Sequence, residues 1–260
     1  MKRNPNGHDY EYRMIKASEI KFDTYQRPLN ESQVHSIVRE FNGDAFNAPK
    51  VSFRDGCYWG FDGRQSTTAW QTYHKNLDEP IECKVFYGMT WEDEVDAFLF
   101  QSGFSKNVAN TWKIRAKYMK KDPDVVDMVR IVRKLGWDVD FENSKVGDPE
   151  MIQAVNAIYQ AYMKLGSVAF EDMMTALREA YGSCHDAVTV QMITGMKVFY
   201  KTFYGQFKHV DLVSSLKHES PMKIIRDAKA IFYNGSNKYA LQICRVYNYK
   251  RRNKLDENKL

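Results

Sequence analysis

The sequence predicts an α+β protein: a small mixed-sheet domain over residues 1–100, followed by a mostly α-helical domain over residues 101–260. Up to about residue 89, short β-rich runs with turn signals alternate with helical patterns. From residue 90 onward almost every segment has the spacing of an amphipathic helix. The chain has 260 residues, of which 43% are hydrophobic, so it can bury a sizeable core and is not expected to be disordered.

The first expected elements are a strand, a helix and a hairpin. Residues 12–17 predict the strand. Asn30 is a good N-cap residue, and Gln33 stands where a capping box places a side chain that bonds back to the cap. Asp55-Gly56 is a strong two-residue turn signal, so residues 51–61 predict a β-hairpin. The apolar positions after Asn30 have helical spacing: Val34, Ile37, Val38 and Phe41.

The hairpin leads into a junction that is typical of anion sites. Gly63 precedes a run without Gly or Pro that predicts a helix, and the first turn of that helix has unpaired N–H groups that favour an anion. An equally supported alternative is that Asp62 caps the helix and Arg64 is solvated. Residues 81–88 alternate and close the sheet. Further donors surround the junction: Arg64, Gln65, Ser66 and Thr67.

Two boxes in this region resemble the ParB N-terminal domain, which has the ParB/sulfiredoxin fold. The first box is matched within residues 20–29 by Tyr25, Gln26 and Arg27, and the second by Asp62, Gly63, Gln65 and Ala69. In that family the two boxes line a nucleotide or phosphate site. The resemblance therefore implies a site formed by Gln26, Arg27, Asp62, Gly63, Arg64, Gln65, Ser66 and Thr67.

The second box departs from the family at one position. Ser66 stands where the family usually has Arg, and Arg64 lies two positions earlier, so it leaves the helix start in a different direction. Sulfiredoxin itself is not expected, because its catalytic Cys lies inside this box and the box has none here. The layout after residue 100 is similar to ParB-like proteins of phages and mobile elements.

The resemblance implies a nucleoside triphosphate with Mg²⁺ as the cofactor, whose binding would shift domain packing. An acidic cluster could hold Mg²⁺ with a phosphate, although its first three members more simply serve the dipole of a helix capped by Thr90. The four cysteines are scattered and the six histidines lack metal-ligand spacing, so no zinc site or disulfide framework is expected. The acidic cluster comprises Glu92, Asp93, Glu94 and Asp96.

Helix start and stop signals divide the second half of the chain. They predict helices from Asp122-Pro123 to Gly136 and from Asp148-Pro149 to Gly166, separated by an extended link over residues 137–141. Further helices are expected up to Gly182, near residues 186–204 and 208–217, after Ser220-Pro221, and from Ser236 to about residue 250. The methionines and aromatic residues in these segments are expected to form the core.

Charge is distributed unevenly along the chain. Residues 1–194 carry 24 Lys and Arg against 28 Asp and Glu, a net charge of −4, whereas residues 195–260 carry 14 against 5, a net charge of +9. The densest basic cluster is Lys250, Arg251, Arg252 and Lys254, and tyrosines are interleaved with this basic region: Tyr233, Tyr239, Tyr247 and Tyr249. This mixture suits phosphate contact with aromatic stacking, and the alternative is a solvated basic tail with core tyrosines.

Residues 208–217 and 221–233 could also form a helix-turn-helix. Ile224, Ile225, Ala228 and Ile231 would then pack it, and its outward side chains would be Lys223, Arg226 and Lys229.

Three functions are compatible with the sequence. The first is a ParB-like nucleic-acid-associated protein that binds a nucleotide or DNA phosphate at the first domain and DNA, in preference to RNA, through the basic helical region. The second is a ParB-like nuclease or phosphate-handling enzyme, and the third an interaction module with a vestigial pocket. We expect the protein to reside in the reducing cytoplasm of a bacterium or of a phage's host and to have no membrane partner. The sequence is also compatible with a homodimer.

Overall fold

The computed structural model describes residues 1–2, 4, 7–104, 110–142, 144, 147–231, 235 and 237–260. The chain forms two compact units, Met1–Lys120 and Lys121–Leu260. The division falls later than the boundary near residue 100 that the sequence suggests. Helix α4 (Asn110–Met119) stays with the first unit because Ala116 and Met119 pack into its hydrophobic cluster.

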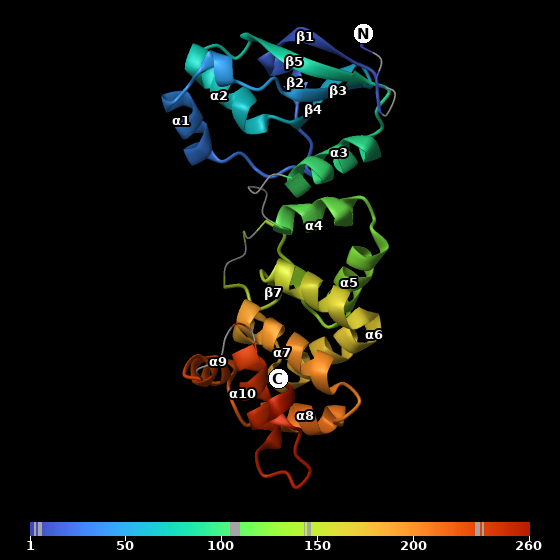
Figure 1. The fold of residues 1–260 in the computed structure, drawn as a ribbon, viewed down its shortest axis with the longest axis vertical. Coiled ribbons are helices and arrows are strands. Elements are labelled where there is room, and N and C mark those ends of the chain that lie inside the picture. The colour runs from blue at the N-terminus through green and yellow to red at the C-terminus, as the bar shows by residue number, and fades with distance from the viewer. Residues whose placement is uncertain are drawn as a thin grey trace. The chain divides into compact units, whose positions relative to one another are not determined.

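The first unit is built on a five-stranded mixed sheet with the strand order β1-β5-β3-β4-β2 (Figure 1). Strands β1 and β5 and strands β3 and β4 are antiparallel, whereas β2–β4 and β3–β5 are parallel. The predicted hairpin is confirmed, and Asp55 and Gly56 have φ of 52° and 72°, the left-handed pair that a type I′ turn needs. The strands are β1 (Tyr10–Lys16), β2 (Ile20–Lys21), β3 (Lys50–Arg54), β4 (Cys57–Asp62) and β5 (Pro80–Tyr87).

Helices pack on both faces of this sheet, because successive side chains along a strand point to opposite faces. Ile81, Cys83 and Val85 of β5 share one cluster with Trp70 of α2, whereas Phe86 belongs to the cluster that contains Val95 of α3. The remaining helices of the unit are α1 (Glu31–Arg39), α2 (Arg64–His74), α3 (Trp91–Phe104) and two short 3-10 helices, η1 (Ala17–Glu19) and η2 (Gly43–Ala45).

Asn30 caps α1 as predicted, because its side chain accepts a hydrogen bond from the Gln33 N–H at 3.0 Å. The expected reciprocal bond from the Gln33 side chain is replaced by a tertiary contact. The Asn30 N–H donates to Oε1 of Gln65, on α2, at 3.1 Å. This bond ties the start of α1 to the start of α2.

The second unit is mostly helical, with a two-stranded parallel sheet of β6 and β7. Helix α7 packs on α6 and α10 and buries methionine and aromatic side chains, as the sequence predicts. The elements are α5 (Pro123–Lys134), β6 (Asp138–Val139), β7 (Met151–Ile152), α6 (Val155–Tyr181), η3 (His185–Val188), α7 (Val190–Phe203), α8 (His209–Leu216), α9 (Pro221–Lys229), α10 (Asn237–Asn248) and η4 (Glu257–Lys259).

One expectation for the second unit differs from the structure, and another is confirmed. The helix expected from Asp148 begins only at Val155, because Ile152 pairs with Val139 in the small sheet. Gly166 interrupts α6 as predicted: its backbone is not helical, with φ of 74° and ψ of 170°, so α6 consists of two helices that meet at a kink. Tyr233, and Ser236 as the start of the last helix, lie outside the described residues.

The four cysteines are free thiols: Cys83 and Cys244 are buried, and Cys57 and Cys184 are half-buried. Burial raises the pKa of both Cys83 and Cys244 to about 12. In the described part of the chain, no helix combines the length and the apolar character needed to cross a membrane.

Candidate functional site

Both sequence boxes line one cavity of the first unit, of about 550 Å³. The loop before α1 contributes Gln26 and Arg27, and the junction between β4 and α2 contributes residues 61–66. Helix α3 supplies part of the wall through Phe98 and Gln101. Cationic side chains converge here from three segments of the chain: Arg27, Lys50 and Arg64.

Hydrogen bonds to strand β4 and helix α2 hold the first box in place. Gln26 is buried, and its amide donates to the backbone carbonyl of Gly60 in β4. The Arg64 guanidinium donates to the Arg27 carbonyl at 3.0 Å and lies 5.8 Å from the ring centroid of Phe22. Burial lowers the pKa of Arg64 from its ordinary value. Arg64 thus connects the two boxes as well as contributing positive charge to the cavity.

Helix α2 begins without a side-chain cap. Gly63 is the N-cap residue, with φ of 95°, and forms no side-chain cap bond. The alternative in which Asp62 caps the helix is therefore wrong, and Asp62 instead forms an ion pair with Lys50 at 3.6 Å. The first N–H groups of α2 lie at the cavity wall that Gly63, Arg64, Gln65 and Ser66 form.

Two of the expected donors are used inside the fold. Gln65 is buried, and its side chain accepts from the Asn30 N–H at 3.1 Å and donates to the Pro28 carbonyl at 3.4 Å. Thr67 is buried and donates to the Gly63 carbonyl at 3.0 Å, so it does not line the cavity. Threonine side chains often bond back to the preceding helical turn in this way.

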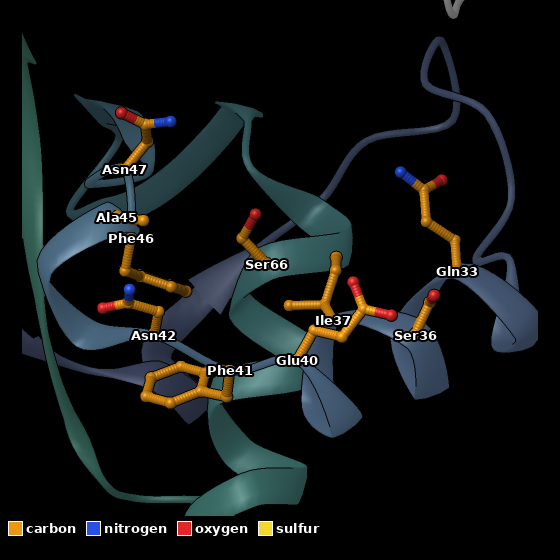
Figure 2. Close-up of a pocket in the computed structure, with 10 residues that line it drawn as sticks. All are labelled: Gln33, Ser36, Ile37, Glu40, Phe41, Asn42, Ala45, Phe46, Asn47 and Ser66. Atoms are coloured by element: carbon orange, nitrogen blue, oxygen red, sulfur yellow. The ribbon is translucent and has the colours of Figure 1, made fainter.

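Ser66 lies where this cavity meets a second hollow, of about 450 Å³, formed by α1, η2 and α2 (Figure 2). Gln33, Ile37 and Ser66 line both spaces. Amide side chains and two phenylalanines form the far wall of the second hollow, among them Asn42, Asn47, Phe41 and Phe46. The small Ser66 side chain therefore leaves the junction between the two spaces open.

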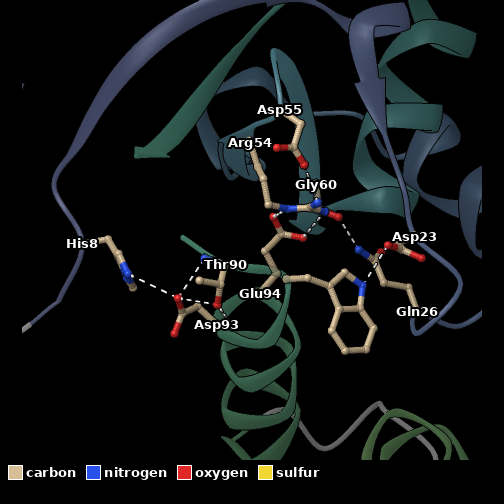
Figure 3. A network of polar contacts seen from close by, with 10 residues as sticks. His8, Asp23, Gln26, Arg54, Asp55, Gly60, Thr90, Asp93 and Glu94 are labelled. Atoms are coloured by element: carbon tan, nitrogen blue, oxygen red, sulfur yellow. Dashed lines mark hydrogen bonds and ion pairs between the residues drawn. The ribbon is translucent and has the colours of Figure 1, made fainter. Parts of the chain in front are cut away.

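A polar network fixes α3 beside the cavity (Figure 3). Glu94 is fully buried and accepts two bonds from the Arg54 guanidinium, at 2.9 and 3.3 Å. These bonds raise the pKa of Arg54. The Trp91 indole N–H donates to Asp23 at 3.0 Å, which ties α3 to the loop of the first box. This network sets the position of the α3 wall.

The acidic cluster does not form a metal site. Glu92, Asp93 and Glu94 lie in the first turn of α3, as expected of acids that serve the helix dipole. Glu94 is also paired with Arg54, and Asp96 is paired with Lys120. Asp93 accepts bonds from Thr90 and lies 3.5 Å from His8. The described residues include no group of three His, Cys, Asp or Glu placed to hold a metal ion.

The basic residues of the second unit have different environments. The Arg251 guanidinium forms an ion pair with Asp211 at 3.1 Å and donates to the Asp211 carbonyl at 2.6 Å, so Arg251 holds the fold together. Tyr247 is buried, which fits a core tyrosine, whereas Tyr249 is 68% exposed. The other basic side chains considered above are exposed: Lys250, Arg252, Lys254, Lys223, Arg226 and Lys229.

The helix-turn-helix expectation is not met. The main contacts of α9 are with α10 and α7, and those of α8 are with α6 and α10. The two helices therefore lack the mutual packing of a helix-turn-helix pair. Ile224, Ile225 and Ala228 are buried as predicted, but their packing partner is mainly α10.

Sequence reasoning missed the residue that shapes the basic cluster. Asn248, at the end of α10, accepts from the Leu255 N–H at 2.8 Å and donates to the Leu255 carbonyl at 2.9 Å. These two bonds close the base of the loop over residues 249–254, which we call the basic loop. A single Asn at a helix end gives no sequence signal for such a role. The position of Lys50 at the cavity of the first unit was also missed, because the sequence gives no signal for it.

Replacing Asn248 with alanine is expected to destabilise the second unit by about 1–3 kcal/mol, because the Leu255 N–H and carbonyl lose buried partners. Chemical denaturation of the full chain measures this change. Asn253, which is exposed within the same loop, provides the control, and Asn253→Ala is expected to leave stability unchanged. Equal effects of the two substitutions would show that Asn248 does not hold the loop.

The match to a known family covers most of both units. Residues 20–258 match the model described as "Family of unknown function (DUF6551)", and the chain belongs to that family. Neither the curated proteins nor the solved structures gave a match.

Proposed function

We propose that this protein is a ParB-like nucleic-acid-associated protein that binds a nucleoside triphosphate in the cavity of its first unit. The supporting observation is that both boxes of the resemblance, 36 residues apart between Gln26 and Asp62, line the same cavity. Its volume of about 550 Å³ falls in the range usual for small-molecule sites, roughly 300–1,000 Å³. Nucleic acid is proposed to bind at the basic region of the second unit, in the cytoplasm of a bacterium or of a phage's host.

The chemistry of the cavity suits phosphate groups. Arg27, Lys50 and Arg64 supply positive charge from three segments, and the uncapped start of α2 supplies N–H groups and the positive end of a helix dipole. The desolvation that lowers the pKa of Arg64 also strengthens its attraction for an anion, because water screens the charge less there.

Mg²⁺ fits this site only when it binds together with the phosphate groups of the nucleotide. Among the described lining residues Asp62 is the one carboxylate, and it is shared with Lys50. Mg²⁺ commonly binds through one or two carboxylates together with substrate phosphates and water. Bound in that way, it would neutralise phosphate charge, with Asp62 as the residue able to hold it.

Calorimetric titration of the full chain with CTP and with ATP, with and without Mg²⁺, tests the proposal. We expect saturable binding of one nucleotide. Arg27→Ala should weaken it by at least about tenfold, through loss of a charge-assisted contact to phosphate. Arg64→Ala should do the same and also loosen the loop of the first box. Arg39→Ala is the control, because Arg39 is exposed on α1 and paired with Glu40.

Unchanged affinity in both Arg27→Ala and Arg64→Ala would overturn the site assignment. Binding of no nucleotide would favour an interaction module with a vestigial pocket, a result for which the internal use of Gln65 and Thr67 gives a physical reason. Turnover that depends on Mg²⁺ and is lost in Arg64→Ala would instead indicate an enzyme of this fold.

A further inference from the structure

The basic loop carries an exposed aromatic ring among exposed cations. Tyr249 is 68% exposed, and the Lys250 amino group lies 5.1 Å from the centre of its ring. Arg252 and Lys254 follow on the same loop and are also exposed. Because Asn248 and Leu255 close the base of the loop, these side chains project from a fixed turn.

Two hollows of the second unit, each of about 640 Å³, border the loop. Lys250 and Arg251 line both, so the two spaces adjoin at the start of the loop. Hydroxyl, amide, imidazole and guanidinium groups line the first: Ser214, Ser215, His218, Gln242, Arg245 and Tyr249. The second is lined by further polar and basic groups, among them Gln206, Lys208, Arg252 and Asn253.

The acids at these hollows are already paired. Asp211 is bound by Arg251 at 3.1 Å, and Glu219 by Lys223 at 2.5 Å. Within the described ranges, Lys208, Lys250, Arg252 and Lys254 form no ion pair. The surface around the loop is therefore positively charged without internal compensation, which favours a polyanion.

We propose that the basic loop and its two hollows bind a single strand of nucleic acid, with an unpaired base stacked on Tyr249 and phosphates held by Lys250 and Arg252. This inference shares one premise with the proposed function, namely that the second unit binds nucleic acid. An exposed ring can stack on a base only where the base has no neighbour on that face, which a regular duplex does not offer. An acidic peptide would use the cations but leave the ring without a role.

Fluorescence anisotropy with the full chain tests this. The probe is a labelled single-stranded DNA of about 16 nucleotides and mixed sequence, compared with the same sequence as a duplex and as RNA. We expect the single strands to bind more tightly than the duplex. Tyr249→Ala should weaken binding by about 5- to 100-fold, as expected for the loss of one stacked base, whereas Tyr249→Phe should retain it.

Lys250→Gly should reduce the slope of log affinity against log salt by about 1, the value for one phosphate contact. Lys75→Gly is a matched control because Lys75, like Lys250, is an exposed lysine in the left-handed conformation, with φ of 52° against 58°. It lies in the first unit and should leave the slope unchanged. Glycine adopts this conformation freely, so both variants are expected to fold.

The outcomes separate this inference from the proposed function. Tighter binding of duplex than of single strands, or equal affinity of Tyr249→Ala and the unchanged protein, would overturn the single-strand site while leaving a nucleic-acid-binding unit. Displacement of the strand by polyglutamate at equal charge concentration would overturn it in favour of an acidic peptide. Binding of no nucleic acid would overturn both, whatever the nucleotide titration of the first unit shows.

Discussion

Replacing Glu94 with alanine is expected to destabilise the first unit by about 3–5 kcal/mol, because the substitution leaves the Arg54 guanidinium without its buried partner. Glu94 is 0% exposed, and Arg54 is only 20% exposed, so water can replace little of the lost interaction. Arg54 keeps its bond to the exposed Asp55 at 3.0 Å and its position over the Trp59 ring, which limits the loss.

Urea denaturation followed by tryptophan fluorescence measures this effect, since four of the five tryptophans belong to the first unit. The double variant Arg54→Met with Glu94→Leu is expected to be more stable than either single variant, because it removes both charges together. The exposed pair of Arg39 and Glu40 is the control, and Glu40→Ala should cost no more than about 1 kcal/mol. A Glu94→Ala effect as small as this control would contradict a buried ion pair.

The second large effect is expected at Gly63. An alanine Cβ there would lie 2.9 Å from Cβ and 3.0 Å from Cα of Pro49, and the φ of 95° is one that side chains rarely adopt. The strain and the close contact together are expected to destabilise the first unit by about 2–4 kcal/mol. Nucleotide binding should fall as well, because the first N–H groups of α2 would move away from the cavity.

Gly56→Ala separates the two causes. Gly56 also has a positive φ, of 72°, but nothing lies within 4 Å of the position its Cβ would take. We expect only the conformational cost of about 1–2 kcal/mol and unchanged nucleotide affinity. Denaturation and calorimetry on both variants provide the comparison. Equal losses of stability at the two glycines would mean that the contact with Pro49 is relieved by a small shift.

Local signals in the sequence predicted most of the first unit. The hairpin, the Asn30 cap, the Gly63 junction and the start of α3 at Thr90 all depend on residues within a few positions of one another. The helix expected at Asp148 is wrong because Asp-Pro also opens turns, and the pairing of Ile152 with Val139 is a tertiary choice. The break at Gly166, by contrast, was predictable from the residue itself, because Gly readily takes the positive φ at which many helices end.

The sequence predicted which residues lie at the candidate site, but not which of their side chains are free to contact a ligand. The resemblance placed both boxes at one site, and the structure places them at one cavity. Whether a polar side chain is available to a ligand or bonds within the protein depends on residues that are distant in the sequence. Gln65 bonds to the Asn30 N–H and the Pro28 carbonyl, and Arg251 pairs with Asp211 40 positions away. Glu94 is similar: an acid in a first helical turn suggests a surface role until its partner on β3 is known.

The distribution of the thiols provides a way to follow the two units in solution. Cys83 and Cys244 are inaccessible and, with pKa values of about 12, hardly ionised at neutral pH, so maleimide dyes should attach first at Cys57 and Cys184. One of these reactive positions lies in each unit. The unaltered chain thus accepts a donor and an acceptor dye without engineered cysteines, and energy transfer between them would report directly whether a nucleotide changes the separation of the units.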